Sequence, residues 1–145
     1  MALQNSIHEK LLEAIMDRMI PAVGDLPSAG QMGLTAEIVQ LAAQQKRFED
    51  LFNSAMEAFE INSPDFLTSM TSIQDENLRT FESNNPHHFN TIRTIVYIVY
   101  YKDPKVHARI GWDGRAPQPK GNQMDPWDES VLVNARKREP FWRKV

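Results

Sequence analysis

The chain has 145 residues and a formal net charge of −3, from 16 Lys and Arg against 19 Asp and Glu. This length predicts one domain, because two domains would each need roughly 100 residues to close an ordinary core. The chain contains no cysteine, which excludes disulfide scaffolds, cysteine-ligated zinc, iron–sulfur clusters and cysteine nucleophiles within it.

The net charge conceals a division along the chain. Residues 1–100 hold 6 basic and 13 acidic side chains, a net charge of −7, whereas residues 101–145 hold 10 and 6, a net charge of +4. The three tryptophans, Trp112, Trp127 and Trp142, all lie in the second segment. Two parts with different roles are therefore expected.

The first predicted helix begins at Ser6, which has the spacing of a capping box with Glu9. An apolar stripe follows, and Pro21 ends the helix; the stripe contains Ile7, Leu11, Ile15 and Met19. Glycines and prolines predict a loop over residues 22–33. The N-terminus has no apolar signal stretch and no twin-arginine pair, so we expect a soluble protein that remains in the cytoplasm.

A long apolar periodicity starts at Thr35 and continues to Phe59. Its one polar member, Gln45, indicates either a local end of packing or a break into two helices. We favour a single helix, which ends at residues 62–64. A loop or short turn and then a short helix capped by Thr71 or Ser72 are expected next.

Residues 89–101 are rich in β-branched and aromatic side chains, a composition typical of a strand. A lone strand would leave its amides without partners, and the chain offers no second strand. Pro86 suits the first turn of a helix. We therefore predict a buried central helix over this segment.

The character of the chain changes after Tyr101. Asp103 and Pro104 predict one helical turn, closed by Gly111, and a last short helix is expected over residues 128–137. The predicted fold is all-α: an irregular helical bundle over residues 1–107, followed in the same domain by a long extended C-terminal tail over residues 108–145.

Catalytic, cofactor-binding and metal-ligating motifs are missing from the sequence. The glycines match no phosphate-binding loop, the four histidines lack metal-ligand spacing, and no serine nucleophile motif is present. The adjacent carboxylates Asp75–Glu76 and Asp128–Glu129 are better explained by the preference for acidic residues in a helix's first turn. Catalysis by this chain alone is not expected, and no cofactor is assigned to it.

The tail interleaves tryptophans and prolines with basic residues, and aromatic and arginine side chains are frequent anchors of protein interfaces. Two other interpretations remain: the tryptophans cover the protein's own helices, or the tail binds nucleic acid. Acidic residues among the basic ones weaken the nucleic-acid interpretation. The predicted partner interface consists of Trp112, Arg115, Pro117, Pro119, Trp127, Phe141, Trp142 and Arg143.

Three segments together resemble the gluconate 2-dehydrogenase subunit 3 family. Residues 17–21 (DRMIP) with 25–30 (DLPSAG) are similar to its opening motif, and Phe89, Arg93 and residues 100–104 (YYKDP) are similar to its "F-x-x-x-R, then Y-Y-S-D-P" segment. Residues 111–121 (GWDGRAPQPKG) resemble its "G-Y-x-G-x-P-Q-P-x-G" segment.

The resemblance implies a non-catalytic small subunit of a flavin-dependent sugar or glycoside dehydrogenase. The FAD and the catalytic histidine would belong to a large partner subunit of the glucose-methanol-choline type, and some such complexes add a cytochrome subunit. Many members carry a twin-arginine signal, which this sequence lacks; export would then depend on a signal-bearing partner. The alternative is a freestanding helical assembly factor or a homo-oligomeric interaction protein. No nucleic acid and no membrane insertion are expected.

Overall fold

The structure is a computed structural model that describes residues 2–115, 120–121, 126 and 128–138. The chain divides into two compact units, residues 1–114 and residues 115–145, which are taken in turn. The described residues form helices and turns without any strand, and only an isolated bridge pairs Val23 with Leu26. The predicted all-α class is thus confirmed.

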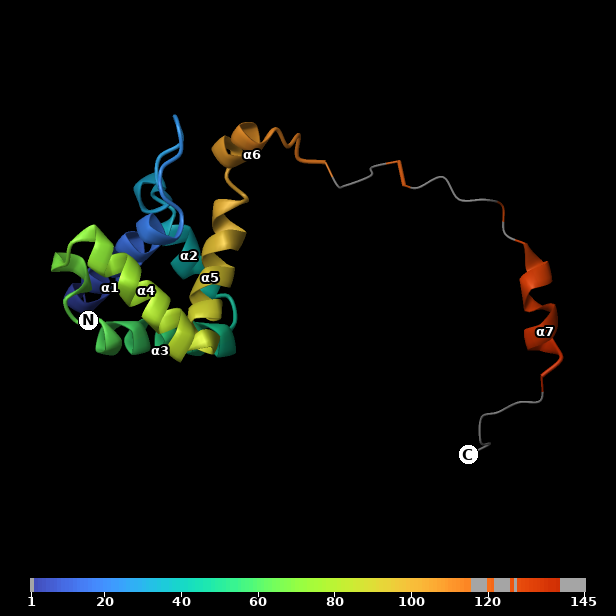
Figure 1. Ribbon diagram of the computed structural model, residues 1–145, viewed down its shortest axis with the longest axis horizontal. Helices are drawn as coiled ribbons and strands as arrows, with labels where there is room; N and C mark the ends of the chain where they lie inside the picture. The colour runs from blue at the N-terminus through green and yellow to red at the C-terminus, as the bar shows by residue number, and fades with distance from the viewer. Residues whose placement is uncertain (1, 116–119, 122–125, 127, 139–145) are drawn as a thin grey trace. The chain divides into compact units, whose positions relative to one another are not determined.

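The first unit, called the helical body below, contains six α-helices and two short 3₁₀-helices among its described residues (Figure 1). In chain order they are α1 (Ala2–Met19), η1 (Gly30–Met32), α2 (Thr35–Ala42), α3 (Lys46–Asn62), η2 (Phe66–Thr68), α4 (Thr71–Asn84), α5 (Pro86–Tyr100) and α6 (Pro104–Ile110). The body includes all of α6 and extends to residue 114.

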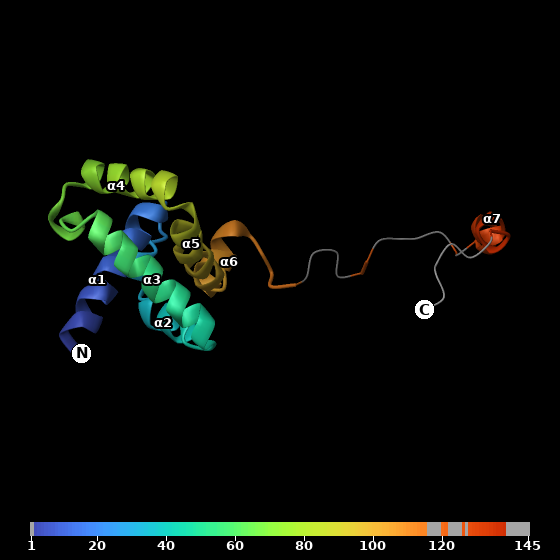
Figure 2. The same cartoon turned by 90° about the horizontal axis from the view of Figure 1, so that it is seen from below.

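Helix α5 is the central element of the body, because it contacts α2, α3 and α4 (Figures 1 and 2). Its buried face carries residues that favour strands in isolation: Ile92, Ile95, Val96, Val99 and Tyr100. Packing against three helices stabilises α5 despite that preference, since tertiary context overrides intrinsic propensity. The helix predicted from Pro86 onward is therefore confirmed.

Three phenylalanines form the densest part of the core. Phe59 of α3 is fully buried, and its ring makes edge-to-face contacts with Phe66 and Phe81 at centroid distances of 4.9 and 5.0 Å. Aromatic pairs favour this geometry because the positive ring edge meets the negative ring face. The contacts hold α3, η2 and α4 together.

The expectation of one helix from Thr35 to Phe59 was wrong. Gln45 is extended, with φ −134° and ψ 125°, so α2 ends at Ala42 and α3 begins at Lys46. Both α2 and α3 pack against α5. The polar residue in the apolar stripe marked the break.

Two predicted helix starts were also wrong. Helix α1 begins at Ala2 rather than Ser6, because residues 2–5 contain good helix formers and no glycine or proline that would stop extension. Helix α4 has Met70 at its N-cap position, without a capping side chain. Instead the Gln74 side chain donates a 2.8 Å hydrogen bond to the Phe66 carbonyl, which connects α4 to η2.

The loop after α1 is held against that helix by one carboxylate. Asp17 Oδ1 accepts a 2.9 Å hydrogen bond from the backbone N–H of Gly30. A Cβ at residue 30 would lie 2.3 Å from the Glu13 carbonyl oxygen and 2.6 Å from Asp17 Oδ1, so only glycine fits there. Arg18, the next residue, pairs with Asp75 of α4 at 3.3 Å.

The second unit contains two short elements in its described residues, η3 (Glu129–Leu132) and α7 (Val133–Arg136), within the range predicted for the last helix. Asp128 caps η3: its carboxylate accepts hydrogen bonds from the Ser130 N–H at 2.8 Å and from the Ser130 hydroxyl at 2.6 Å. Both hydrogen bonds lower the pKa of Asp128, and the bond from the Ser130 hydroxyl has the larger effect. None of the described side chains of this unit is buried.

Across the described residues, each helix is too short or too polar to cross a bilayer. The same residues contain no group of three His, Cys, Asp or Glu side chains placed to hold a metal ion.

Candidate functional site

Two of the eight predicted interface residues, Trp112 and Arg115, belong to the described part of the chain. Trp112 lies at the end of the helical body, and Arg115 is an exposed residue at the start of the second unit. The other six predicted residues lie outside the described residues: Pro117, Pro119, Trp127, Phe141, Trp142 and Arg143.

Trp112 is fixed by the way α6 ends. Gly111 has a left-handed backbone (φ 71°), its N–H donates to the Ala108 carbonyl at 3.3 Å, and the Trp112 N–H donates to the His107 carbonyl at 2.9 Å. This pair of bonds is the Schellman motif, which glycine favours because it has no Cβ to strain. The indole follows directly from a rigid turn and remains 43 % exposed.

The indole packs against the ring of His107, with centroids 4.3 Å apart and planes at 80°. The His107 Nε2 atom in turn lies 2.6 Å from the Tyr101 carbonyl oxygen, so this histidine joins α6 to the end of α5. Trp112 is therefore held to the end of α5 through two contacts: its own ring contact with His107, and the contact of His107 with the Tyr101 carbonyl oxygen.

Tyr101, at the end of α5, continues this series of contacts onto α5. Its ring makes edge-to-face contacts with Tyr97 and Tyr100, at centroid distances of 5.8 and 5.2 Å. Tyr97 and Tyr101 are 39 % and 50 % exposed, and Ile98 beside them is 52 % exposed. We call Tyr97, Ile98, Tyr101 and Trp112 the aromatic surface.

Tyr100, whose ring contacts that of Tyr101, is itself buried in the core. Burial, followed by the charges of Tyr101 and Asp103, raises the pKa of its hydroxyl, so the neutral phenol is favoured in the folded protein. The boundary between core and exposed surface thus runs between two adjacent tyrosines.

Polar groups border the aromatic surface. Lys102 Nζ donates to Glu37 of α2, an ion pair that links α2 to the end of α5. A hollow of about 330 Å³ lies between these helices, with Ile98 and Lys102 in its lining.

Two further basic residues, Lys105 and Arg109, follow on α6, where the Arg109 guanidinium lies 4.0 Å from Asp25. Exposed aromatic groups with a polar border are typical of protein interfaces.

The sequence reasoning missed Tyr97, Ile98 and Tyr101, because it treated the whole of α5 as buried. A signal was present: apolar side chains surround almost the entire helix between residues 92 and 101. Such a helix is usually buried on all sides. Here the body covers one face and leaves the other exposed.

Several residues that carry the family resemblance have structural roles in the described part of the chain. Asp17 holds Gly30, and Gly111 ends α6. Asp103 caps α6 by accepting a 2.7 Å hydrogen bond from the Lys105 N–H. These contacts give each of these residue types a structural reason.

Comparison with protein-family models, with curated proteins and with solved structures gives no match.

Proposed function

We propose that this chain is the non-catalytic small subunit of a flavin-dependent sugar or glycoside dehydrogenase, and that it binds and stabilises a large subunit of the glucose-methanol-choline type. The FAD and the catalytic residues belong to that partner. The family is suggested by the three motif segments, and the geometry of the aromatic surface supports the binding role.

The observation that carries the proposal is the exposure of the aromatic surface. Four large side chains, each between 39 % and 52 % exposed, lie on rigid helix ends rather than on a loose loop. Rigid aromatic anchors lose little conformational entropy when they bind, which favours association. Covering them with a partner would also remove apolar area from water.

The second unit is assigned to the same proposed interface. Its described residues contain no buried side chain, so its apolar groups, such as Val131, have apolar area that a partner could cover. A segment that becomes ordered on a partner can cover a large surface, at an entropic cost. The six predicted interface residues that lie outside the described part of the chain are assigned to the same interface.

The test is to purify the tagged chain from its natural source and to measure bound FAD and sugar-dependent dye reduction in the eluate. We expect both to be present. Tyr101→Ala or Trp112→Ala should weaken association by on the order of 2 kcal/mol, roughly 30-fold. Ile61→Ala is the matched control, because Ile61 is 79 % exposed at the end of α3, outside the aromatic surface.

Two results would contradict the proposal. One is an eluate without flavin in which light scattering shows a monodisperse monomer or homo-oligomer, which would favour the freestanding assembly factor. The other is undiminished flavoprotein recovery after both aromatic substitutions. Truncation after Gly111 separates the contribution of the segment beyond it from that of α5.

A further inference from the structure

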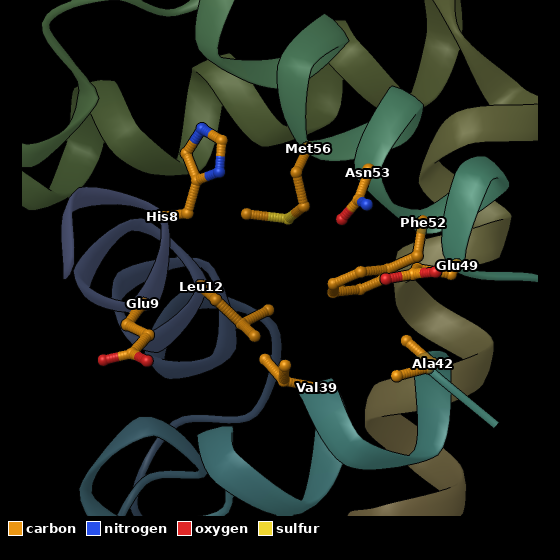
Figure 3. A pocket seen from close by; sticks show the side chains of 10 residues that line it. His8, Glu9, Leu12, Val39, Ala42, Glu49, Phe52, Asn53 and Met56 are labelled. Carbon is orange, nitrogen blue, oxygen red and sulfur yellow. The ribbon is translucent and has the colours of Figure 1, made fainter. Parts of the chain in front are cut away.

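A second feature of the helical body is a hollow between α1, α2 and α3 (Figure 3). Its volume is about 220 Å³. Leu12 of α1, Val39 of α2, and Phe52 and Met56 of α3 all turn toward the same space. The hollow belongs entirely to the helical body and includes no residue of the aromatic surface.

The hollow lies beside the end of α2, where the chain breaks before α3. Ala42 and Ala43 end α2 beside the hollow, and their small side chains leave it unfilled. Three members of the lining, Leu12, Phe52 and Met56, are at most 5 % exposed, whereas Val39 at the mouth is 45 % exposed. The hollow is thus an apolar recess that opens to solvent past an exposed valine.

The polar side chains that line the hollow are His8, Glu9, Glu49 and Asn53, two of which are carboxylates. Glu9 and Glu49 belong to the lining, and His8 beside them is 3.1 Å from Glu60. Lys46 is shared between Glu49 at 3.3 Å and Asp50 at 2.8 Å. Glu9 and Glu49 are thus the two carboxylates of the lining, whereas Lys46, Asp50 and Glu60 lie outside it.

Lys46 lies beside one of the lining carboxylates, Glu49. Hydrogen bonds to Asp50 and then to Glu49 raise the pKa of this lysine. A cation bound beside Glu9 would be attracted by that carboxylate, and solvent would weaken the attraction.

Size limits the occupant to one compact group. An apolar cavity of about 150 Å³ admits benzene, whereas sites for drug-sized ligands span about 300–1,000 Å³. A volume of about 220 Å³ accommodates one aromatic or branched apolar group. A peptide would place a single side chain in it and leave its backbone outside.

We propose that this hollow binds a small organic cation, in which one aromatic or branched apolar group carries an ammonium. The apolar group lies against Leu12, Phe52 and Met56, and the ammonium faces the carboxylates of Glu9 and Glu49. This site is independent of the flavoprotein assignment, and binding does not require a partner.

Three indole probes with different heads test the proposal on the purified full-length chain: tryptamine, tryptophol and indole-3-acetate. Binding is followed by the NMR shift of the Met56 methyl group at low ionic strength, with the 71 %-exposed Met70 as an internal reference. Tryptamine should bind about three- to fivefold tighter than tryptophol, the effect of an exposed ion pair. Indole-3-acetate should bind weakest.

Substitutions locate the site. Ala43→Leu fills the hollow and should weaken tryptamine binding by at least about tenfold, because it takes the volume of the indole. Ala36→Leu is the matched control: Ala36 is also exposed on α2 but does not line the hollow, and binding should not change. Glu9→Gln and Glu49→Gln should bring the affinities for tryptamine and tryptophol together, whereas Glu82→Gln on α4 should leave the difference intact.

Three outcomes would overturn the proposal: no shift of Met56 at millimolar tryptamine, equal affinity for all three probes, or unchanged binding in Ala43→Leu. A fourth concerns the class of ligand. If the peptide acetyl-Lys-Trp-Lys-amide binds more than tenfold tighter than tryptamine, the hollow receives a side chain of a partner protein instead of a small cation.

Discussion

The helical body and the segment that follows it contain similar local signals but fold by different means. Both have an aspartate that caps a helical turn, Asp103 before α6 and Asp128 before η3. In the body α6 buries Val106 in a shared core, whereas η3 and α7 bury no side chain. Capping alone therefore defines where a turn begins, and packing decides whether that turn contributes to cooperative stability.

The largest difference should come from the aromatic core. Phe59→Ala removes a fully buried ring that contacts Phe66 and Phe81, and we expect unfolding free energy to fall by about 3–5 kcal/mol. Urea denaturation followed by circular dichroism measures this loss. Val131→Ala, at a 64 %-exposed position after residue 114, should change it by less than about 0.5 kcal/mol. Comparable losses would refute the division into a core-forming body and a segment without a core.

A smaller loss is expected from Gly30→Ala. The new Cβ would overlap the Glu13 carbonyl, so the loop must leave α1 and lose the hydrogen bond to Asp17, at a cost of about 3 kcal/mol. Gly33→Ala is the control for backbone strain, since residue 33 has φ 71° and no atom within 4 Å of the added group. It should cost only about 1 kcal/mol. Equal costs in thermal unfolding would mean that the loop is not part of the cooperative body.

The two caps give the most direct test of the comparison. Asp103→Ala should lower the stability of the body by about 1 kcal/mol, because the Lys105 N–H loses its acceptor. Asp128→Ala removes an equivalent hydrogen bond from η3 but should leave the main unfolding transition unchanged. Amide hydrogen exchange should show faster exchange at Ser130 in that variant. A shift of the main transition would show that the second unit unfolds with the body.

The smallest effect concerns Tyr100. Its pKa is raised in the folded state, so the folded protein holds this proton more tightly than the unfolded chain does. The associated stability is fully present below the unfolded pKa of about 10 and is lost as pH rises through the folded value. Tyr100→Phe should therefore reduce the fall in unfolding free energy above pH 10.

Local signals in the sequence were sufficient wherever neighbouring residues determine the structure. The Asp103 cap and the Gly111 turn were predicted correctly, because a short side chain or a missing Cβ acts within a few residues. Helix α5 was predicted for a different reason: a strand there would have had no partner. The caps at Ser6 and at Thr71 or Ser72 were wrong, since the same residue types also occur inside helices.

The candidate site was predicted only in part. Trp112 was identified from its composition and context, but Tyr97, Ile98 and Tyr101 were assigned to the core with the rest of α5. The hollow was not predicted either, because it lies beside the break at Gln45, and the periodicity favoured one continuous helix. Both omissions arise from long-range packing, which periodicity does not encode.

The sequence by itself determined the all-α class, the Asp103 cap and Gly111 end of α6, and the separation of an acidic part from a basic, tryptophan-containing part. Only the tertiary structure decided which face of α5 is covered, where the helix after Thr35 breaks and which side chains surround the hollow. The physical reason is that helix formation depends on neighbours within a few residues, whereas burial depends on which helices fit together around a limited core.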